Sequence, residues 1–129
     1  MKRYLLIDSL KLEATNPEDF TLYLKDPLDK ALTKICLKAA TLTPSYNSTN
    51  CGYISIRCSM LTTDDNFINN EKSDVIAVAY GPFVRGKIGM NFPKLIHNTN
   101  CIRMYVTDCN NIPLKSGTIS WAVYELEFT

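Results

Sequence analysis

The sequence predicts an all-β fold, an antiparallel β-sandwich of jelly-roll-like order with about eight short strands. Short segments of alternating or β-branched apolar residues recur along the chain, separated by loops rich in Pro, Asn, Asp and Gly. No long segment shows the 3.6-residue periodicity of an amphipathic helix. A length of 129 residues suits one domain, so we expect residues 1–129 to form a single sandwich.

The N-terminal third of the chain predicts three strands. They are expected at residues 3–10, 20–24 and 32–42. The Asn16-Pro17 dipeptide favours a turn between the first two. The third segment also contains good helix formers, and a short helix at 28–32 is an alternative. The stretch between Pro27 and Pro44 is short for a helix with its loops, so we favour a strand.

The middle of the chain predicts two further strands with a polar loop between them. The strands are expected at residues 53–61 and 75–80. The loop, residues 62–73, is the best candidate for a surface contact. Its proposed contact residues are Asp64, Asp65, Asn66 and Phe67. The spacing of its acidic residues does not match an EF-hand, so no calcium site is predicted.

The C-terminal part predicts three more strands, and the last organises the sheet. They are expected at residues 86–92, 102–107 and 117–129. In the last strand, Trp121 and Val123 fall on one face, whereas Tyr124 and Phe128 fall on the other. Large apolar residues on both faces are typical of a strand covered on both sides. We therefore expect this strand to be central, with its second face against another layer or another subunit.

Excess outward apolar surface predicts contacts between subunits. The residues predicted to form this interface are Val75, Val78, Tyr80, Trp121, Tyr124, Leu126 and Phe128. A closed ring of identical subunits would bury them. We expect a homo-oligomer, a trimer ahead of a pentamer.

Charge and hydropathy exclude several classes of partner. The chain has 14 basic and 13 acidic residues, a net charge of +1, so no basic surface for nucleic acid is predicted. No run reaches the roughly 18 apolar residues of a membrane span. The apolar stretch at the N-terminus is too short for the core of a signal peptide. These features predict a protein made and kept in a cytosol-like compartment.

The five cysteines are scattered, without a Cys-x-x-Cys motif. This pattern favours free thiols in a reducing compartment over a disulfide framework. His97 is the single histidine, so a zinc site is not expected. We predict no metal and no cofactor.

The sequence carries no strong catalytic motif. It has neither a Gly-rich phosphate loop nor a Gly-x-Ser-x-Gly elbow. Glu125 and Glu127 share a strand face, and paired carboxylates are the minimum for a glycosidase. They could equally be charges at an edge or an interface. We therefore expect no catalytic residues and no enzymatic activity, and keep an enzyme that uses these carboxylates as the weakest alternative.

Several short motifs resemble a family of virion proteins. They are Ile7-Asp8-Ser9, Asp19-Phe20-Thr21, Pro27-Leu28, Ile35-Cys36-Leu37, Pro44-Ser45-Tyr46-Asn47, Tyr105 to Pro113 and Leu126-Glu127-Phe128. Together they resemble small virion proteins of large eukaryotic DNA viruses, virophages and polinton-like elements. The resemblance implies a sandwich that assembles at a capsid vertex, in a spike or fibre, or as a minor capsid cement. It brings no catalytic residues.

The first functional hypothesis is therefore a non-enzymatic structural protein of a virion. It would contact other virion proteins and reach the particle after synthesis in the host cytoplasm. The alternative is a binding module, either carbohydrate-binding or similar to the trimers of the tumour-necrosis-factor family. The seven tyrosines and one tryptophan could supply a sugar-stacking surface. A shallow aromatic cluster with convergent polar groups would favour the carbohydrate hypothesis.

Overall fold

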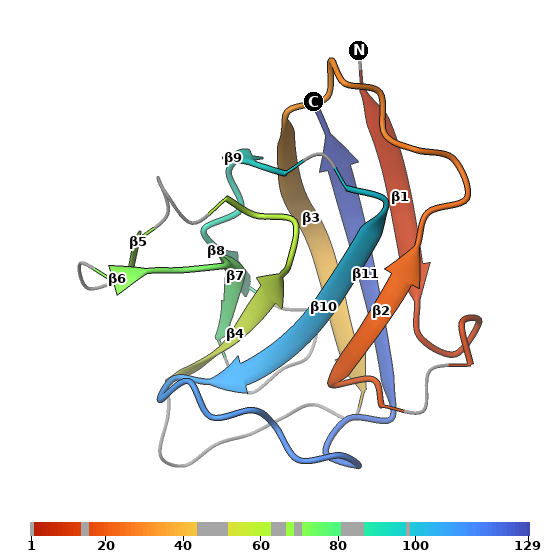
Figure 1. Cartoon of the computed structure of the whole chain (residues 1–129). Helices are drawn as coiled ribbons and strands as arrows, with labels where there is room; N and C mark the ends of the chain where they lie inside the picture. The colour runs from red at the N-terminus through yellow and green to blue at the C-terminus, as the bar shows by residue number, and fades with distance from the viewer. Residues whose placement is uncertain are drawn as a thin grey trace.

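Two antiparallel sheets face each other in a sandwich (Figure 1). The computed structural model describes residues 2–13, 16–43, 52–62, 67–68, 71–80, 87–97 and 99–129. The first sheet contains β1 (Arg3–Asp8), β11 (Trp121–Phe128), β3 (Lys34–Thr43) and β9 (Lys94–Leu95), in that order. The second contains β2 (Asp19–Tyr23), β10 (Cys101–Asp108), β4 (Tyr53–Cys58), β7 (Val75–Tyr80) and β8 (Lys87–Gly89). None of the described residues is helical.

The strand order is that of a jelly roll. Antiparallel pairs are nested along the chain: β1 with β11, β2 with β10, β3 with β9, and β4 with β7. Successive nested pairs alternate between the two sheets. A long hairpin that is folded over in this way produces two facing sheets, which is the jelly-roll arrangement. The predicted fold class is confirmed, with β8 added at the margin of the second sheet.

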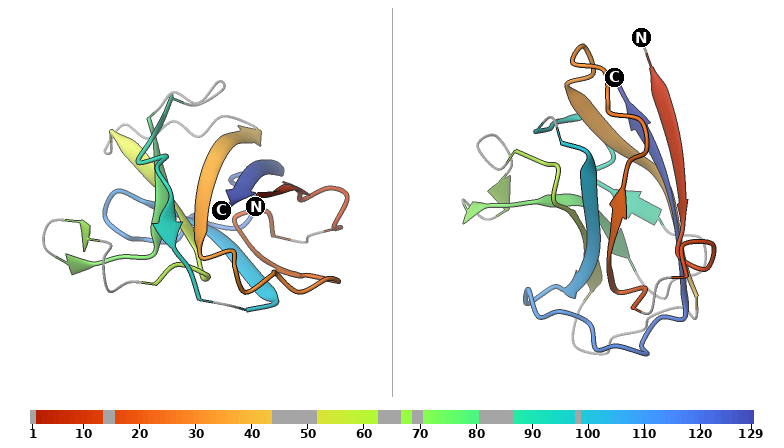
Figure 2. Two further views of the ribbon diagram at one scale, coloured as in Figure 1. Left: turned by 90° about the horizontal axis from the view of Figure 1, so that it is seen from above. Right: turned by 45° about the vertical axis from the view of Figure 1, so that its right-hand side comes forward.

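A small hairpin projects from this sandwich beside the second sheet (Figure 2). It is formed by β5 (Phe67–Ile68) and β6 (Glu71–Lys72), which pair with each other and with neither large sheet. The sequence predicted only a polar loop at this place. These strands are two residues long, too short for a periodic pattern to be recognised.

The central position of the last strand is confirmed. β11 lies between β1 and β3 and pairs with both along its length. Its inward residues Ala122, Tyr124, Leu126 and Phe128 are buried. Its outward face combines Trp121, which is 38% exposed, with exposed Glu125 and half-buried Val123 and Glu127. Within the single chain, this strand is therefore covered by a second layer on its inward face only, and coverage of its outward face by another subunit stays a prediction.

Burial within the single chain accounts for most of the predicted interface. Tyr124, Leu126 and Phe128 belong to the core between the sheets. Val75 and Val78 are also buried, at 0% and 7% exposed, but they pair with Arg57 and Ser55 on the outward face of the second sheet. Side chains with so little exposed surface offer almost no contact to another subunit, so these five assignments are corrected to buried residues of the single chain. Tyr80 and Trp121 remain partly exposed, at 49% and 38%.

The outermost strands of the two sheets lie at neighbouring margins of the sandwich. β1 is the outermost strand of the first sheet, and β2 is the outermost strand of the second. The loop after β2 is tied to β1, because the Arg3 guanidinium donates to the carbonyl oxygens of Asp26 at 3.2 Å and Pro27 at 3.4 Å.

The described residues contain no helix long and apolar enough to cross a membrane.

Candidate functional site

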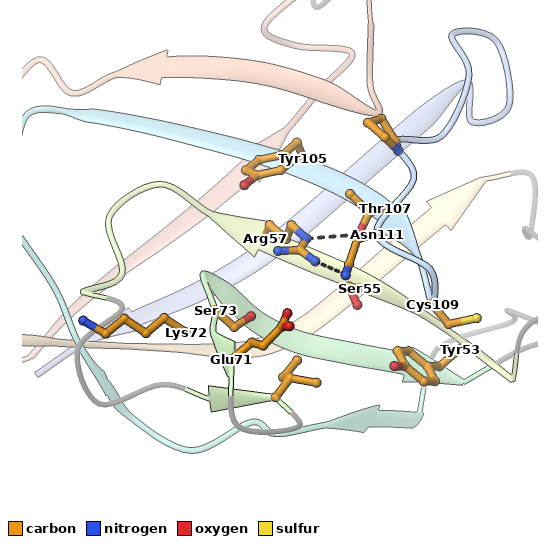
Figure 3. Close-up of a pocket in the computed structure, with 12 residues that line it drawn as sticks. Tyr53, Ser55, Arg57, Glu71, Lys72, Ser73, Tyr105, Thr107, Cys109 and Asn111 are labelled. Carbon is orange, nitrogen blue, oxygen red and sulfur yellow. Dashed lines mark hydrogen bonds between the residues drawn. The ribbon is translucent and has the colours of Figure 1, made fainter.

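A hollow of about 520 Å³ lies on the outward face of the second sheet, beside the β5–β6 hairpin (Figure 3). Its floor comes from alternate residues of β4 and β10, and its walls come from the hairpin and the turn after β10. The lining residues are Tyr53, Ser55, Arg57, Ile68, Glu71, Lys72, Ser73, Tyr105, Thr107, Cys109, Asn111 and Pro113.

The period-two geometry of the strands makes this floor polar. Along β4, Ile54 and Ile56 point into the core, so Ser55 and Arg57 point outward. The register pairs Ser55 with Thr107, and both residues are almost completely buried, at 2% and 3% exposed. A polar face this deeply covered is unusual for the outer surface of a sandwich. The structure therefore concentrates hydrogen-bonding groups at the base of the hollow.

Arg57 is the centre of this floor. Its guanidinium donates to Thr107 Oγ1 at 3.0 Å, to Asp74 Oδ1 at 2.7 Å and to Asn111 Oδ1 at 2.5 Å. The side chains of Arg57 and Asp74 are 14% and 22% exposed, so this ion pair is shielded from water. The planar guanidinium fork suits such a multiple contact. Three separate parts of the chain are thereby fixed around one side chain.

Tyr105 forms one end of the hollow. Its hydroxyl donates to Asp74 Oδ2, and its ring lies 4.2 Å from the guanidinium carbon of Arg103. Burial, followed by the hydrogen bond to the Asp74 carboxylate, raises the pKa of Tyr105 to about 12. Arg103 is itself fixed by two hydrogen bonds to Asp19, at 2.8 and 2.7 Å. The phenol is therefore neutral and held in one orientation.

Tyr53 forms the opposite end of the hollow (Figure 3). It is half-buried, and its ring contacts Tyr80 edge to face with centroids 6.4 Å apart. Glu71 and Lys72 on the hairpin bring one charge of each sign to the wall. With the Arg57–Asp74 pair, the hollow combines two aromatic ends with balanced charge. It suits a neutral ligand that carries many hydroxyl groups better than a strongly ionic one.

The predicted contact residues are only partly within the described structure. Phe67 begins β5 of the hairpin, next to Ile68, which lines the hollow. Asp64, Asp65 and Asn66 lie outside the described residues. Tyr80 touches the site through Tyr53, whereas Trp121 belongs to the first sheet and donates through Nε1 to Asp8 at 2.7 Å.

The cysteines differ from their prediction. Cys36 and Cys58 are buried free thiols, and Cys101 is free and half-buried. Cys109, at the wall of the hollow, is disulfide-bonded. The remaining cysteine, Cys51, lies outside the described residues. The expectation that all five are free thiols is therefore wrong, and a cross-link restrains the turn that borders the site.

The acidic pair considered for catalysis lies away from this hollow. Glu125 is exposed on the first sheet and lines two shallow depressions together with Lys38. Glu127 is half-buried on the same strand face. In the part of the chain that the structure describes, no three His, Cys, Asp or Glu side chains cluster as metal ligands would.

Comparison with known proteins adds no assignment. No protein-family model matches this chain, and no curated protein matches its sequence. The similarity of its short motifs to virion proteins therefore stays a prediction.

Sequence reasoning missed the hollow because its residues come from distant segments. Tyr53, Ser55 and Arg57 were recognisable as one outward strand face. Their neighbours Tyr105 and Thr107 follow only from the pairing of β4 with β10. The available signal was an arginine on an outward strand face whose neighbouring positions carry hydroxyl groups. A charged side chain at such a position needs a partner.

Proposed function

We propose that this protein is a non-enzymatic binding module for a neutral carbohydrate. The observation that carries the proposal is the hollow on the second sheet, where Tyr53 and Tyr105 flank a row of convergent polar groups. A shallow aromatic cluster with convergent polar groups is the feature expected to favour a carbohydrate ligand over a purely structural role. Jelly rolls are also a frequent scaffold of lectin domains.

The chemistry of the floor supports this ligand class. A sugar ring offers an apolar C–H face and several hydroxyl groups in one plane. An aromatic side chain packs against the former, and fixed donors and acceptors satisfy the latter. Asn111 supplies an exposed amide group, the buried hydroxyls of Ser55 and Thr107 form the base beneath it, and the Arg57 network fixes the positions of Thr107 and Asn111. Pre-organised groups lose less conformational entropy on binding.

The test is a titration of the full chain against a panel of neutral oligosaccharides, with Tyr53→Ala compared with wild type. Removal of the aromatic end should weaken binding of the best saccharide by about tenfold or more, equivalent to about 1.4 kcal/mol. Tyr23→Ala is the matched control, because Tyr23 lies on β2 of the same sheet, outside the hollow, and is 74% exposed. It should bind like the wild type.

Two results would remove the proposal. One is the absence of binding to every saccharide of the panel at saccharide concentrations up to about 10 mM. The other is equal loss of affinity in Tyr53→Ala and Tyr23→Ala, since the effect would then not depend on the hollow. Thermal unfolding of both variants shows whether each is folded.

A structural role in a virion is the second candidate. Two observations favour it: the jelly-roll strand order, which many capsid proteins share, and the exposed apolar residues Tyr4, Leu6 and Trp121 on the first sheet. Fold alone is a weak guide to function, so the hollow takes precedence. Light scattering at micromolar concentration tests this candidate. A stable trimer or pentamer would support it, whereas a monomer or a dimer would leave the predicted ring without support.

A further inference from the structure

The outer margin of β1 presents an exposed strand edge of apolar character. Tyr4 and Leu6 point outward from the sandwich and are 66% and 61% exposed. β11 occupies one side of β1, and no strand of the described residues pairs with the other side (Figure 1). Neither a proline nor a register shift interrupts this strand. Edges of this kind invite pairing with another strand unless the protein protects them.

The direction of the backbone groups shows what the edge offers. The Ser9 N–H donates to Ala122 O of β11 at 2.9 Å, so the backbone groups of Ser9 point towards β11. Because backbone groups alternate along a strand, those of Tyr4 and Leu6 point to the open side. The Asp8 carbonyl, of the same parity, accepts from Leu12 N within the following turn, at 3.1 Å. Tyr4 and Leu6 therefore carry the hydrogen-bonding groups that a further strand would meet.

We propose that β1 is a homodimerisation edge, which pairs antiparallel with β1 of a second copy about a two-fold axis at Leu5. This inference is independent of the carbohydrate site, because the site lies on the other sheet. The axis places Tyr4 opposite Leu6 of the second copy, and Leu6 opposite Tyr4. Both members of each pair have backbone groups on the open side, so each pair can exchange two hydrogen bonds.

Charge complementarity selects this register and this occupant. The same axis places Lys2 opposite Asp8 of the second copy, at both ends of the paired strands. A hydrogen bond from Trp121 Nε1, ahead of bonds from the following turn, holds the pKa of Asp8 below its usual range, so its carboxylate is charged. An axis moved to Leu6 would place Tyr4 opposite Asp8 and Lys2 opposite Leu10, without an ion pair. The strand is thus complementary to itself in one register.

The paired edges would join the two first sheets into one continuous sheet. The outward side chains Tyr4 and Leu6 of each copy would pack against each other across the axis, which is the usual unit of sheet stabilisation. Only one short strand from each copy takes part, so the buried area falls in the range of weak interfaces. We therefore expect a reversible dimer that forms at about 100 µM rather than at nanomolar concentration.

Sedimentation velocity of the full chain over a concentration series tests the pairing. Leu6→Pro removes an N–H that points to the open side and costs no hydrogen bond within the sheet, because proline is accepted on an edge strand. We expect this variant to stay folded and monomeric. Lys2→Glu places two like charges opposite each other and should raise the dissociation constant about tenfold.

Ile112→Ser is the matched control, since Ile112 is also an exposed apolar residue, at 59%, but lies in the turn after β10. It should associate like the wild type. Hydrogen exchange gives an independent readout, because the amides of Tyr4 and Leu6 should gain protection with rising concentration. A monomer throughout the series, an oligomer that is not a dimer, or a dimer unchanged by both Leu6→Pro and Lys2→Glu would overturn the proposal.

Discussion

Tyr124 places a polar atom at the centre of an apolar core. The side chain is fully buried, and its ring stacks against Phe20 with centroids 6.2 Å apart. Its hydroxyl has no hydrogen-bond partner among the described residues. Burial, with a smaller contribution from the charge of Glu18, raises the pKa of this phenol above its usual range. The ring therefore stabilises the core, whereas the hydroxyl costs desolvation.

Replacement of this hydroxyl separates the two effects. Tyr124→Phe keeps the ring and should leave the free energy of unfolding equal or raise it by about 1 kcal/mol, because a buried unpaired polar group is lost. Tyr124→Ala should lower it by about 3–5 kcal/mol through loss of the ring and the resulting cavity. Urea denaturation measures both. A loss of more than about 1 kcal/mol in Tyr124→Phe would show that the hydroxyl has a partner.

At the scale of elements, Lys94 connects the short strand β9 to the opposite sheet. Its ammonium donates to Ile76 O of β7 at 2.9 Å, to Phe92 O at 3.1 Å and to Met90 O. The ring of Phe92 lies 3.9 Å from Nζ. Burial lowers the pKa of Lys94 to about 8. The Lys94 ammonium thus has backbone carbonyls as its partners in place of a carboxylate, and these hydrogen bonds fix the chain between β8 and β9.

The lowered pKa of Lys94 has a consequence for stability against pH. Between about pH 8 and 10.5 the unfolded chain keeps a proton that the folded chain has released. Stability then rises with pH, because the unfolded state binds more protons. We expect the free energy of unfolding of the wild type, relative to Lys94→Met, to increase through this interval. Lys38→Met, at an exposed lysine of β3, should show no such change relative to the wild type. A flat difference for Lys94→Met would contradict the assignment.

A local sequence pattern is enough to predict that a segment forms a strand, but it does not predict what covers each face of that strand. The segment at 32–42 was ambiguous between helix and strand, and it forms β3 because β11 and β9 pair on its two sides. The pair β5 and β6 and the strand β9 were missed, since two residues carry no period. The sequence predicts an interface at Tyr124 and Phe128, because large residues on one face of a strand look alike whether they meet a second sheet or a second subunit.

At the scale of the whole molecule, composition and patterning were enough for the class of fold and the central place of the last strand. The candidate site required more, because Arg57 meets Thr107 and Asn111 only through the pairing of β4 with β10. Those contacts join residues 50 and 54 positions apart in the chain. No local pattern encodes which distant strand will be the neighbour, so the polar floor emerges only with the topology.

The last prediction concerns the stability of the whole sandwich in alkali. Burial raises the pKa of the Cys58 thiol from 9.0 to about 12, and burial with the Asp74 carboxylate raises that of Tyr105 from 10.0 to about 12. The unfolded chain releases these protons at lower pH, so the folded state binds more protons and stability falls as pH rises towards 12.

Lys94 acts in the opposite direction up to about pH 10.5, so the loss should become steep only above that pH. Chemical denaturation at intervals of pH checks this course. The double variant Cys58→Ala with Tyr105→Phe should show a shallower decline than the wild type, since both protons are then absent from the balance. A wild type whose stability still increased near pH 11, or a double variant with an unchanged slope, would mean that these two groups do not set the alkaline limit.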